Sequence, residues 1–237
     1  MEIDEAQAVI KAAMKLDNIQ IKTAILVFLY TGIRKSELTG LQWPDMDLEK
    51  GIISINRIVQ QIDGRGLVVG TPKTDSGARS ISISSDLVSQ LRHYKLWQNT
   101  QKVKTGDQWQ KKECEMWVSG GTEKDPRNAE DFQPIEWVFT GSAGYPIHPS
   151  TTYHWIKKFL TDNGHPDNMT VHGLRHTNIS LLLSQGVDLI TVSRRAGHAK
   201  PSITADIYAH ALKKPDENAA EKLNDLFSSS FAIISTV

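Results

Sequence analysis

The chain has 237 residues, 39% of them hydrophobic and 23% charged with no net charge, so we expect one globular domain with an inserted loop, although this length would also allow two small domains. No apolar run approaches the roughly 18 residues that span a bilayer, and the start "MEIDEAQAVIKAAM" lacks the basic and apolar regions of a secretory signal, which argues against integral-membrane and exported proteins. The lone cysteine, Cys114, has no partner for an internal disulfide, which suits a reducing cytoplasm.

The first 45 residues have helical periodicity. Apolar residues at helical spacing predict a helix over 4–16. The more apolar run "IQIKTAILVFLY" predicts a buried helix that stops at Gly32, a residue type that favours helix C-caps. A short helix in "RKSELTGLQW" follows, and Pro44 marks its end.

The pattern then changes to short runs rich in Ile and Val. "GIISINRI", "LVVGTPKT" and "RSISIS" are separated by the turn-forming stretches "DGRG" and "DSGA", which predicts a small three-stranded antiparallel sheet. A helical pattern returns over 84–104, and the loop composition of "SGGTEKDPRNAEDFQP" predicts an exposed insertion over 105–136. Further helices are expected at 149–162, 173–185, 188–195, 201–212 and 216–227. The predicted fold class is α+β, mainly α-helical.

Charge is distributed unevenly along the chain. Residues 51–112 carry ten Lys or Arg against four Asp, a net charge of +6, whereas residues 113–136 carry two basic against seven acidic side chains, a net charge of −5. A basic face of this kind suits a nucleic acid. The alternative is two solvated surface patches of opposite sign.

The stretch "VHGLRHTNIS" places His172, Arg175 and His176 on one face at the start of a predicted helix. Because a helix N-terminus already has partial positive charge and free N–H groups, these side chains would form an anion site suited to phosphate. A solvated basic turn is the simpler alternative. Zinc binding by the two histidines is a third, but no Glu follows His172 and Arg175 would put a positive charge beside the metal.

These residues belong to a longer set of motifs that resembles the tyrosine recombinases, the phage integrase family. "HGLRHT" followed by "AGHAKPSITADIYAH" resembles the C-terminal signature of the family, "TGIRKSELTGLQW" its upstream arginine motif, and "TPKTDSGARSISIS" its β-hairpin lysine segment. The resemblance covers roughly residues 4–210 in the same order, which is more specific than any single motif. It departs at Ala196, where the family usually has Leu, and in the longer, more acidic stretch 105–136.

The resemblance implies a catalytic set, which consists of Arg34, Lys73, His172, Arg175, His198 and Tyr208. The two arginines would clamp the non-bridging oxygens of a DNA phosphate, because planar guanidinium groups match that geometry. His198 would add a third donor to the phosphate, and Glu37 would orient Arg34.

Tyr208 would be the nucleophile. With a reference pKa of about 10, ionising it at neutral pH costs roughly 4 kcal/mol, so a base is needed, and His172 would accept the proton. Lys73 would protonate the departing 5′ oxygen. The product would be a 3′-phosphotyrosine that a 5′-hydroxyl can reverse. No metal or other cofactor is implied, since the chain has no convincing carboxylate cluster of the two-metal kind.

Taken one at a time, these residues have ordinary alternatives. Arg34 could form only a surface ion pair with Glu37, His198 could be a loop histidine, Tyr208 a half-buried aromatic and Lys73 a solvated lysine. Their order along the chain is what favours the catalytic reading.

The family resemblance also implies partners. We expect double-stranded DNA, a homo-oligomer on DNA in the form of a tetrameric synapse, accessory excision or bending factors, and action in the cytoplasm of a bacterial host without a membrane. Because the pattern begins within a few residues of Met1, we expect residues 1–237 to be a catalytic domain without the DNA-binding domains that usually precede it. The tail over 213–237 is expected to dock on its own domain or, as we prefer, on a neighbour in trans.

Three functions are compatible with these features. The preferred one is a site-specific recombinase that integrates or excises a mobile element or prophage. A type IB topoisomerase shares the chemistry but relaxes DNA without exchanging partners. A non-catalytic DNA-binding regulator is the third, although a binder would not need both Tyr208 and Lys73.

Overall fold

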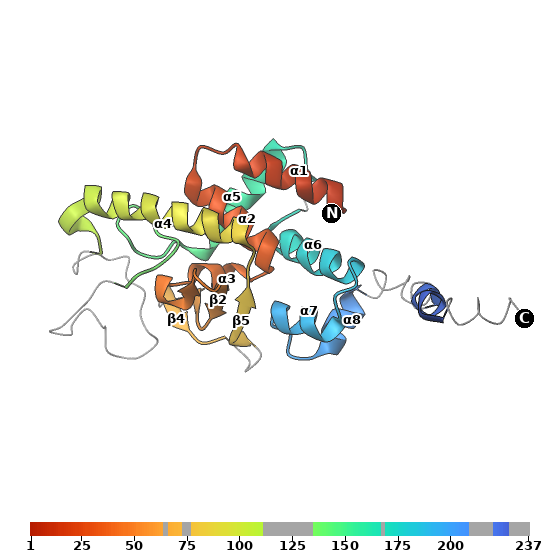
Figure 1. The fold of residues 1–237 in the computed structure, drawn as a ribbon. Helices are drawn as coiled ribbons and strands as arrows, with labels where there is room; N and C mark the ends of the chain where they lie inside the picture. Colours follow the sequence, from red (N-terminus) through yellow and green to blue (C-terminus); the bar gives the residue numbers. More distant parts are fainter. Residues whose placement is uncertain (64–65, 73–76, 111–134, 167–168, 209–219, 228–237) are drawn as a thin grey trace, which may run out of the picture.

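A computed structural model describes residues 1–63, 66–72, 77–110, 135–166, 169–208 and 220–227 of the chain (Figure 1). The described part is mainly helical, as predicted. Its α-helices are α1 (Ile3–Met14), α2 (Ile19–Thr31), α3 (Lys35–Thr39), α4 (Ser85–Thr105), α5 (Pro149–Asp162), α6 (Val171–Ser184), α7 (Leu189–Ala196) and α8 (Pro201–Tyr208). Short 3-10 turns lie at η1 (Trp43–Asp45) and η3 (Gly106–Gln108), and residues 220–227 are also helical.

Helix α2 forms the centre of the hydrophobic core. Its sequence is apolar nearly all round, and it packs against α1, α4, α5 and α6. Asn18 and Gly32 set its ends. The Asn18 side chain accepts from the backbone N–H groups of Gln20 and Ile21, and the left-handed backbone of Gly32, with φ +64°, terminates the helix. This end of α2 leads directly into the polar cluster described below.

The strands form two small sheets. A three-stranded antiparallel sheet is present, but its strands are β1 (Met46–Asp47), β2 (Ile52–Ile55) and β5 (Arg79–Ser82), in the order β1-β2-β5. Strands β3 (Ile58–Ile62) and β4 (Gly66–Gly70) pair separately as a two-stranded antiparallel sheet. The prediction that the three runs share one sheet is therefore wrong. The run "GIISINRI" contains β2 and the first residue of β3, "RSISIS" contains β5, and "LVVGTPKT" contains most of β4, which belongs to the other sheet.

The interruption between β2 and β3 has a specific cause. The Asn56 side chain donates to Asp45 Oδ1 at 2.8 Å, and Arg57 forms an ion pair with the other carboxylate oxygen of Asp45. Asp45 is buried and belongs to η1, so these contacts hold residues 56–57 toward η1. The chain consequently leaves one sheet and starts another.

The described ends of the predicted insertion are joined by a buried glutamine. Gln110 Nε2 donates to the carbonyl oxygens of Ile135 and Gly144 at 2.6 and 2.8 Å, and the Ile135 N–H donates to Gln110 Oε1 at 2.8 Å. Residues 111–134, most of the predicted 105–136 loop, lie outside the described residues.

The last helices bring distant parts of the sequence together. Figure 1 shows α6 extending from beside α2 toward α7 and α8, and α7 packs against β5. A small apolar cluster of Ile179, Leu183, Val192 and Ala196 joins α6 to α7. The linker between α7 and α8 therefore lies close to the end of α2 and the start of β5.

Candidate active site

Arg34 lies between α2 and α3, where it reaches toward the linker between α7 and α8. Its Nη1 donates to Glu37 Oε1 at 2.8 Å and its Nη2 donates to the carbonyl oxygen of Gly197 at 3.0 Å. The Arg34 backbone N–H donates to the other Glu37 oxygen at 2.8 Å. The side chain is still 43% exposed, so the guanidinium is oriented by the protein and remains accessible.

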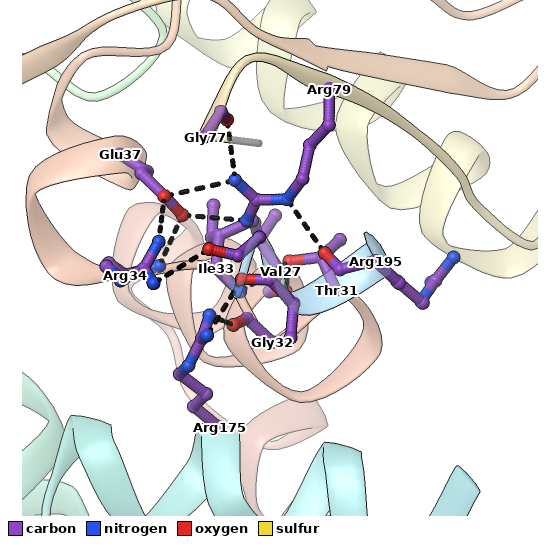
Figure 2. Close-up of polar contacts among 12 residues, drawn as sticks. Val27, Thr31, Gly32, Ile33, Arg34, Glu37, Gly77, Arg79, Arg175 and Arg195 are labelled. Atoms are coloured by element: carbon purple, nitrogen blue, oxygen red, sulfur yellow. Dashed lines mark hydrogen bonds and ion pairs between the residues drawn. The ribbon is translucent and has the colours of Figure 1, made fainter. Parts of the chain in front are cut away.

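Glu37 is the buried centre of this cluster. Its side chain is 1% exposed, and it lies between Arg34 and Arg79, as Figure 2 shows. Arg79 donates from Nη1 and Nη2 to the two carboxylate oxygens at 3.1 and 2.9 Å. Burial alone would raise the pKa of Glu37, but the hydrogen bonds and charge of Arg79, followed by those of Arg34, hold this pKa below its ordinary value. The carboxylate is therefore ionised and fixed in place.

Arg175 is the second arginine of the cluster and belongs to α6. Its side chain is buried, with Nη1 donating to the carbonyl oxygen of Gly32 at 2.5 Å and Nη2 to that of Ala196 at 2.7 Å. Arg175 and Arg34 thus bond to the successive carbonyls of Ala196 and Gly197, respectively. Two guanidinium groups 141 positions apart in the sequence are brought to the same short linker.

His198 follows these two carbonyls directly. Its Nδ1 is hydrogen-bonded to the hydroxyl of Thr204 at 2.7 Å, which connects the linker to α8. Burial, followed by the charges of Arg175, Arg34 and other nearby cationic groups, lowers the pKa of His198 to about 4. The imidazole is therefore neutral at physiological pH.

His172 and His176 form a pair on α6. Their rings meet edge to face with centroids 4.6 Å apart. Burial, and then the positive charges of Arg175 and Arg34, lower the pKa of His172. Burial, and then His172 and Arg175, lower the pKa of His176. Both histidines lie on α6 within three residues of Arg175, and the charge of Arg175 contributes to both lowered pKa values.

A cavity of about 780 Å³ opens next to Arg34. Side chains of α3, β3, the N-terminus of α5 and the α7–α8 linker line it, including Arg34, Lys35, Gln60, His148 and His198. Pro72 and Gly77, the described residues on either side of 73–76, also line it. The cavity is thus bordered by cationic and polar groups from several elements.

Four of the six predicted catalytic residues are brought together in this way: Arg34, His172, Arg175 and His198. Lys73 lies outside the described residues, directly after Pro72. Tyr208 is the last residue of α8, one helical turn after Thr204, and its side chain is also outside what the structure describes.

Arg79 was not predicted as part of the site. In "RSIS" it shares a strand face with Ile81, so an arginine on the apolar face was visible from the alternation alone. The buried partner that explains this position, Glu37, is 42 residues away and could not be predicted from the local sequence.

Within the described ranges, no group of three or more His, Cys, Asp or Glu side chains is arranged to hold a metal ion. The pair His172 and His176 therefore has no third ligand of these types among the described residues. Within those same ranges, no helix has the length and apolar character needed to cross a membrane.

Comparison with known proteins supplies an independent result. Residues 1–214 match the model of the phage integrase family. The chain is 34% identical over 232 residues to a "Tyrosine recombinase XerC-like" of Caldanaerobacter subterraneus subsp. tengcongensis, covering 94% of this chain and 54% of the relative. It is 29% identical over 210 residues to the "ICEBs1 integrase" of Bacillus subtilis, with 89% and 50% covered. The chain thus spans about half the length of these curated relatives.

Solved structures show the same fold. The Tn1549 transposon integrase, in a complex with a circular intermediate DNA, matches with a TM-score of 0.70 at 21% identity, covering 94% of this chain and 65% of that one. The XerA recombinase matches with a TM-score of 0.62 at 21% identity, with 97% and 64% covered. The predicted tyrosine-recombinase catalytic fold is confirmed.

Proposed function

The chain belongs to the phage integrase family, and from this membership and the geometry of its site we propose that it is the catalytic domain, over residues 1–237, of a site-specific recombinase. It cleaves and rejoins double-stranded DNA to integrate or excise a mobile element or prophage in the cytoplasm of a bacterial host. One observation carries the proposal: Arg175 and Arg34 bond to the successive carbonyls of Ala196 and Gly197, respectively, directly before His198.

This arrangement suits the binding of a DNA phosphate. Attack on a phosphodiester increases the negative charge on the two non-bridging oxygens, and guanidinium groups held in advance stabilise that charge without reorganising. Arg34 and Arg175 contact these oxygens, and His198 donates to the same phosphate. Glu37 keeps Arg34 oriented through the contact at 2.8 Å. Loss of either arginine would lower the cleavage rate by on the order of 10²–10³-fold.

The reaction exchanges one phosphodiester for another. The Tyr208 oxygen forms a bond to phosphorus while the bond from phosphorus to the 5′ oxygen breaks, so a 3′-phosphotyrosine and a free 5′-hydroxyl result. His172 takes the tyrosine proton and Lys73 gives a proton to the departing 5′ oxygen. The lowered pKa of His172 keeps it neutral and able to accept a proton near neutral pH. Attack by a 5′-hydroxyl from another strand reverses these steps and completes the exchange.

The proposal is tested by covalent trapping. The full chain is incubated in EDTA with a pool of nicked duplexes of randomised sequence. The nick makes the fragment released by cleavage short, so that it diffuses away, and a 5′ label on the cleaved strand stays with the adduct. We expect an SDS-resistant adduct with wild type and none with Tyr208→Phe, a change that removes only the nucleophilic oxygen. Sequencing of the trapped strands gives the preferred site.

The controls distinguish the alternatives. DNA binding by Tyr208→Phe, measured by gel shift, shows that the variant is folded. An adduct that persists in Tyr208→Phe, or binding without any wild-type adduct, would contradict the proposal. Relaxation of supercoiled plasmid without a defined site would instead identify a topoisomerase.

The assembly on DNA is part of the same proposal. We expect a tetrameric synapse, accessory excision or bending factors, and docking of the 213–237 tail on a neighbouring copy. If deletion of residues 228–237 leaves the DNA-bound assembly unchanged in analytical ultracentrifugation, docking in trans is wrong.

A further inference from the structure

Arg79 is a buried arginine outside the predicted catalytic set. It begins β5, and its side chain is 7% exposed. Besides its two bonds to Glu37, its Nε donates to the carbonyl oxygen of Arg195 at 2.8 Å and its Nη1 to that of Gly77 at 2.9 Å. A fork of this kind fixes three separate partners with a single planar group.

Each partner adjoins a different part of the proposed site (Figure 2). Glu37 orients Arg34. The Arg195 carbonyl immediately precedes those of Ala196 and Gly197, to which Arg175 and Arg34 bond. Gly77 is the first described residue after the 73–76 segment. Arg79 is therefore the point at which α3, the end of α7 and the start of β5 are joined.

The linker also packs directly on this guanidinium. A Cβ atom placed on Gly197 would lie 2.6 Å from Arg79 Nη1, so the backbone before His198 rests against it. All three nitrogens of the Arg79 guanidinium already donate to protein oxygens, those of Glu37, Arg195 and Gly77. Its influence on the site is exerted through its neighbours.

We propose that Arg79 is the positioning residue of this site: it holds Glu37, and through it Arg34, in register with the 195–198 segment for phosphate binding. The inference rests on the proposed recombinase function. It assigns to Arg79 a role in the rate of cleavage without any contact to the DNA.

Removal of Arg79 has a consequence that a merely structural residue would not have. In Arg79→Met, the buried carboxylate of Glu37 keeps only Arg34 as a charged partner, so burial raises its pKa toward the working range. The other ionisable groups around the adjoining cavity are Lys35, His148 and His198. The charge of Arg79 also lowers the pKa of His198, and this contribution is lost equally in Arg79→Met and in its double variant with Glu37→Gln. If the cleavage rate of Arg79→Met falls at acid pH and this fall is absent when Glu37→Gln is added to the same chain, the titrating group is therefore Glu37.

The experiment measures single-turnover cleavage from about pH 5 to about pH 8, on the nicked site recovered by trapping, alongside DNA affinity and urea unfolding. We expect Arg79→Met to keep its DNA affinity within about twofold while its cleavage rate falls on the order of 100-fold, with a further loss toward acid pH. Glu37→Gln should be slow without that acid limb, and the double variant should be no slower than Glu37→Gln by more than about threefold.

Two further variants complete the design. Arg79→Lys keeps the charge but loses the fork, so its rate should fall between those of wild type and Arg79→Met. Arg92→Met is the matched control, because Arg92 also pairs with a glutamate, Glu49, at an exposed position. Its cleavage rate and pH profile should equal those of wild type. If Arg79→Met does not fold, the same test is made with Arg79→Lys, alone and combined with Glu37→Gln.

The inference is overturned if Arg79→Met cleaves at the wild-type rate, if its losses follow only the unfolded fraction with an unchanged pH profile, or if the effects of the two substitutions add. In each case wild type and Arg92→Met still form the adduct. If the proposed function itself is wrong, neither wild type nor any variant forms an adduct. That result would also overturn the inference about Arg79.

Discussion

Gly197 offers the sharpest test of how tightly the site is built. It has φ +69°, in the left-handed region that favours glycine, and its carbonyl oxygen accepts from Arg34 Nη2 at 3.0 Å. An alanine Cβ at this position would lie 2.6 Å from Arg79 Nη1 and 2.8 Å from its Cζ. Gly197→Ala therefore adds backbone strain and a clash with a side chain that is held by several hydrogen bonds.

The expected loss of stability can be worked from these two contributions. A left-handed conformation costs a non-glycine residue about 1–2 kcal/mol. Moving the guanidinium far enough to relieve the clash breaks at least one charge-assisted hydrogen bond, which costs about 1.5–3 kcal/mol. Gly197→Ala should thus lower the free energy of unfolding by about 2.5–5 kcal/mol.

The assay is urea unfolding of Gly197→Ala beside Gly186→Ala. Gly186 has φ +79°, but among the described residues a Cβ there would meet nothing within 4 Å, so this variant measures the backbone strain alone. We expect a loss of about 1–2 kcal/mol for Gly186→Ala. Equal losses for the two variants would refute the reasoning, because they would show that Arg79 moves aside freely.

Two further predictions concern stability. Burial and nearby cationic groups lower the pKa of His198 to about 4 in the folded chain, whereas the unfolded value is about 6.5. The unfolded chain therefore binds this proton first, so stability should be unaffected above about pH 6.5 and fall as the pH drops from there toward about 4. After a discount for solvent screening, we expect His198 to account for a loss on the order of 1 kcal/mol between about pH 7 and about pH 5, measured by urea unfolding. His198→Gln should reduce this pH dependence, and an unchanged slope would contradict the assignment. Gln110→Ala removes two hydrogen bonds to Ile135, which join the two ends of 111–134, and a third to Gly144, and it should cost about 2–3 kcal/mol in the same assay. The exposed Gln108→Ala is its control, with an expected change within about 0.5 kcal/mol; equal losses would show that Gln110 does not anchor the segment.

Helix positions were predictable because local signals set them. The helix predicted over 149–162 has the bounds of α5, and the predicted stop of α2 at Gly32 is confirmed by its left-handed C-cap. The strands were less predictable, since the break after Ile55 depends on contacts of Asn56 and Arg57 with Asp45, more than ten residues earlier. Alternation within a short run does not report such a contact.

The residues of the site likewise differ in how far they could be predicted from the sequence. Arg34, His172, Arg175 and His198 were predicted because the order of motifs along the chain resembles a known family, and the fold brings them together. The residue that joins them, Arg79, lies in the segment "TPKTDSGARSISIS", but its partners are 42 and 116 positions away. Its importance follows from burial and hydrogen bonding, which exist only once the chain has folded.

The electrostatics of the cluster connect phosphate binding to the pKa values of the nearby histidines. Glu37 is shared between Arg34 and Arg79 and offsets only part of their charge, and Arg175 donates to the carbonyl oxygens of Gly32 and Ala196. The remaining positive charge adds to burial in lowering the pKa values of all three nearby histidines. On the proposed function, a DNA phosphate placed between the arginines cancels much of this charge, so these pKa values rise on binding. Because a higher pKa makes His172 a stronger base, binding of the phosphate favours transfer of the Tyr208 proton to it.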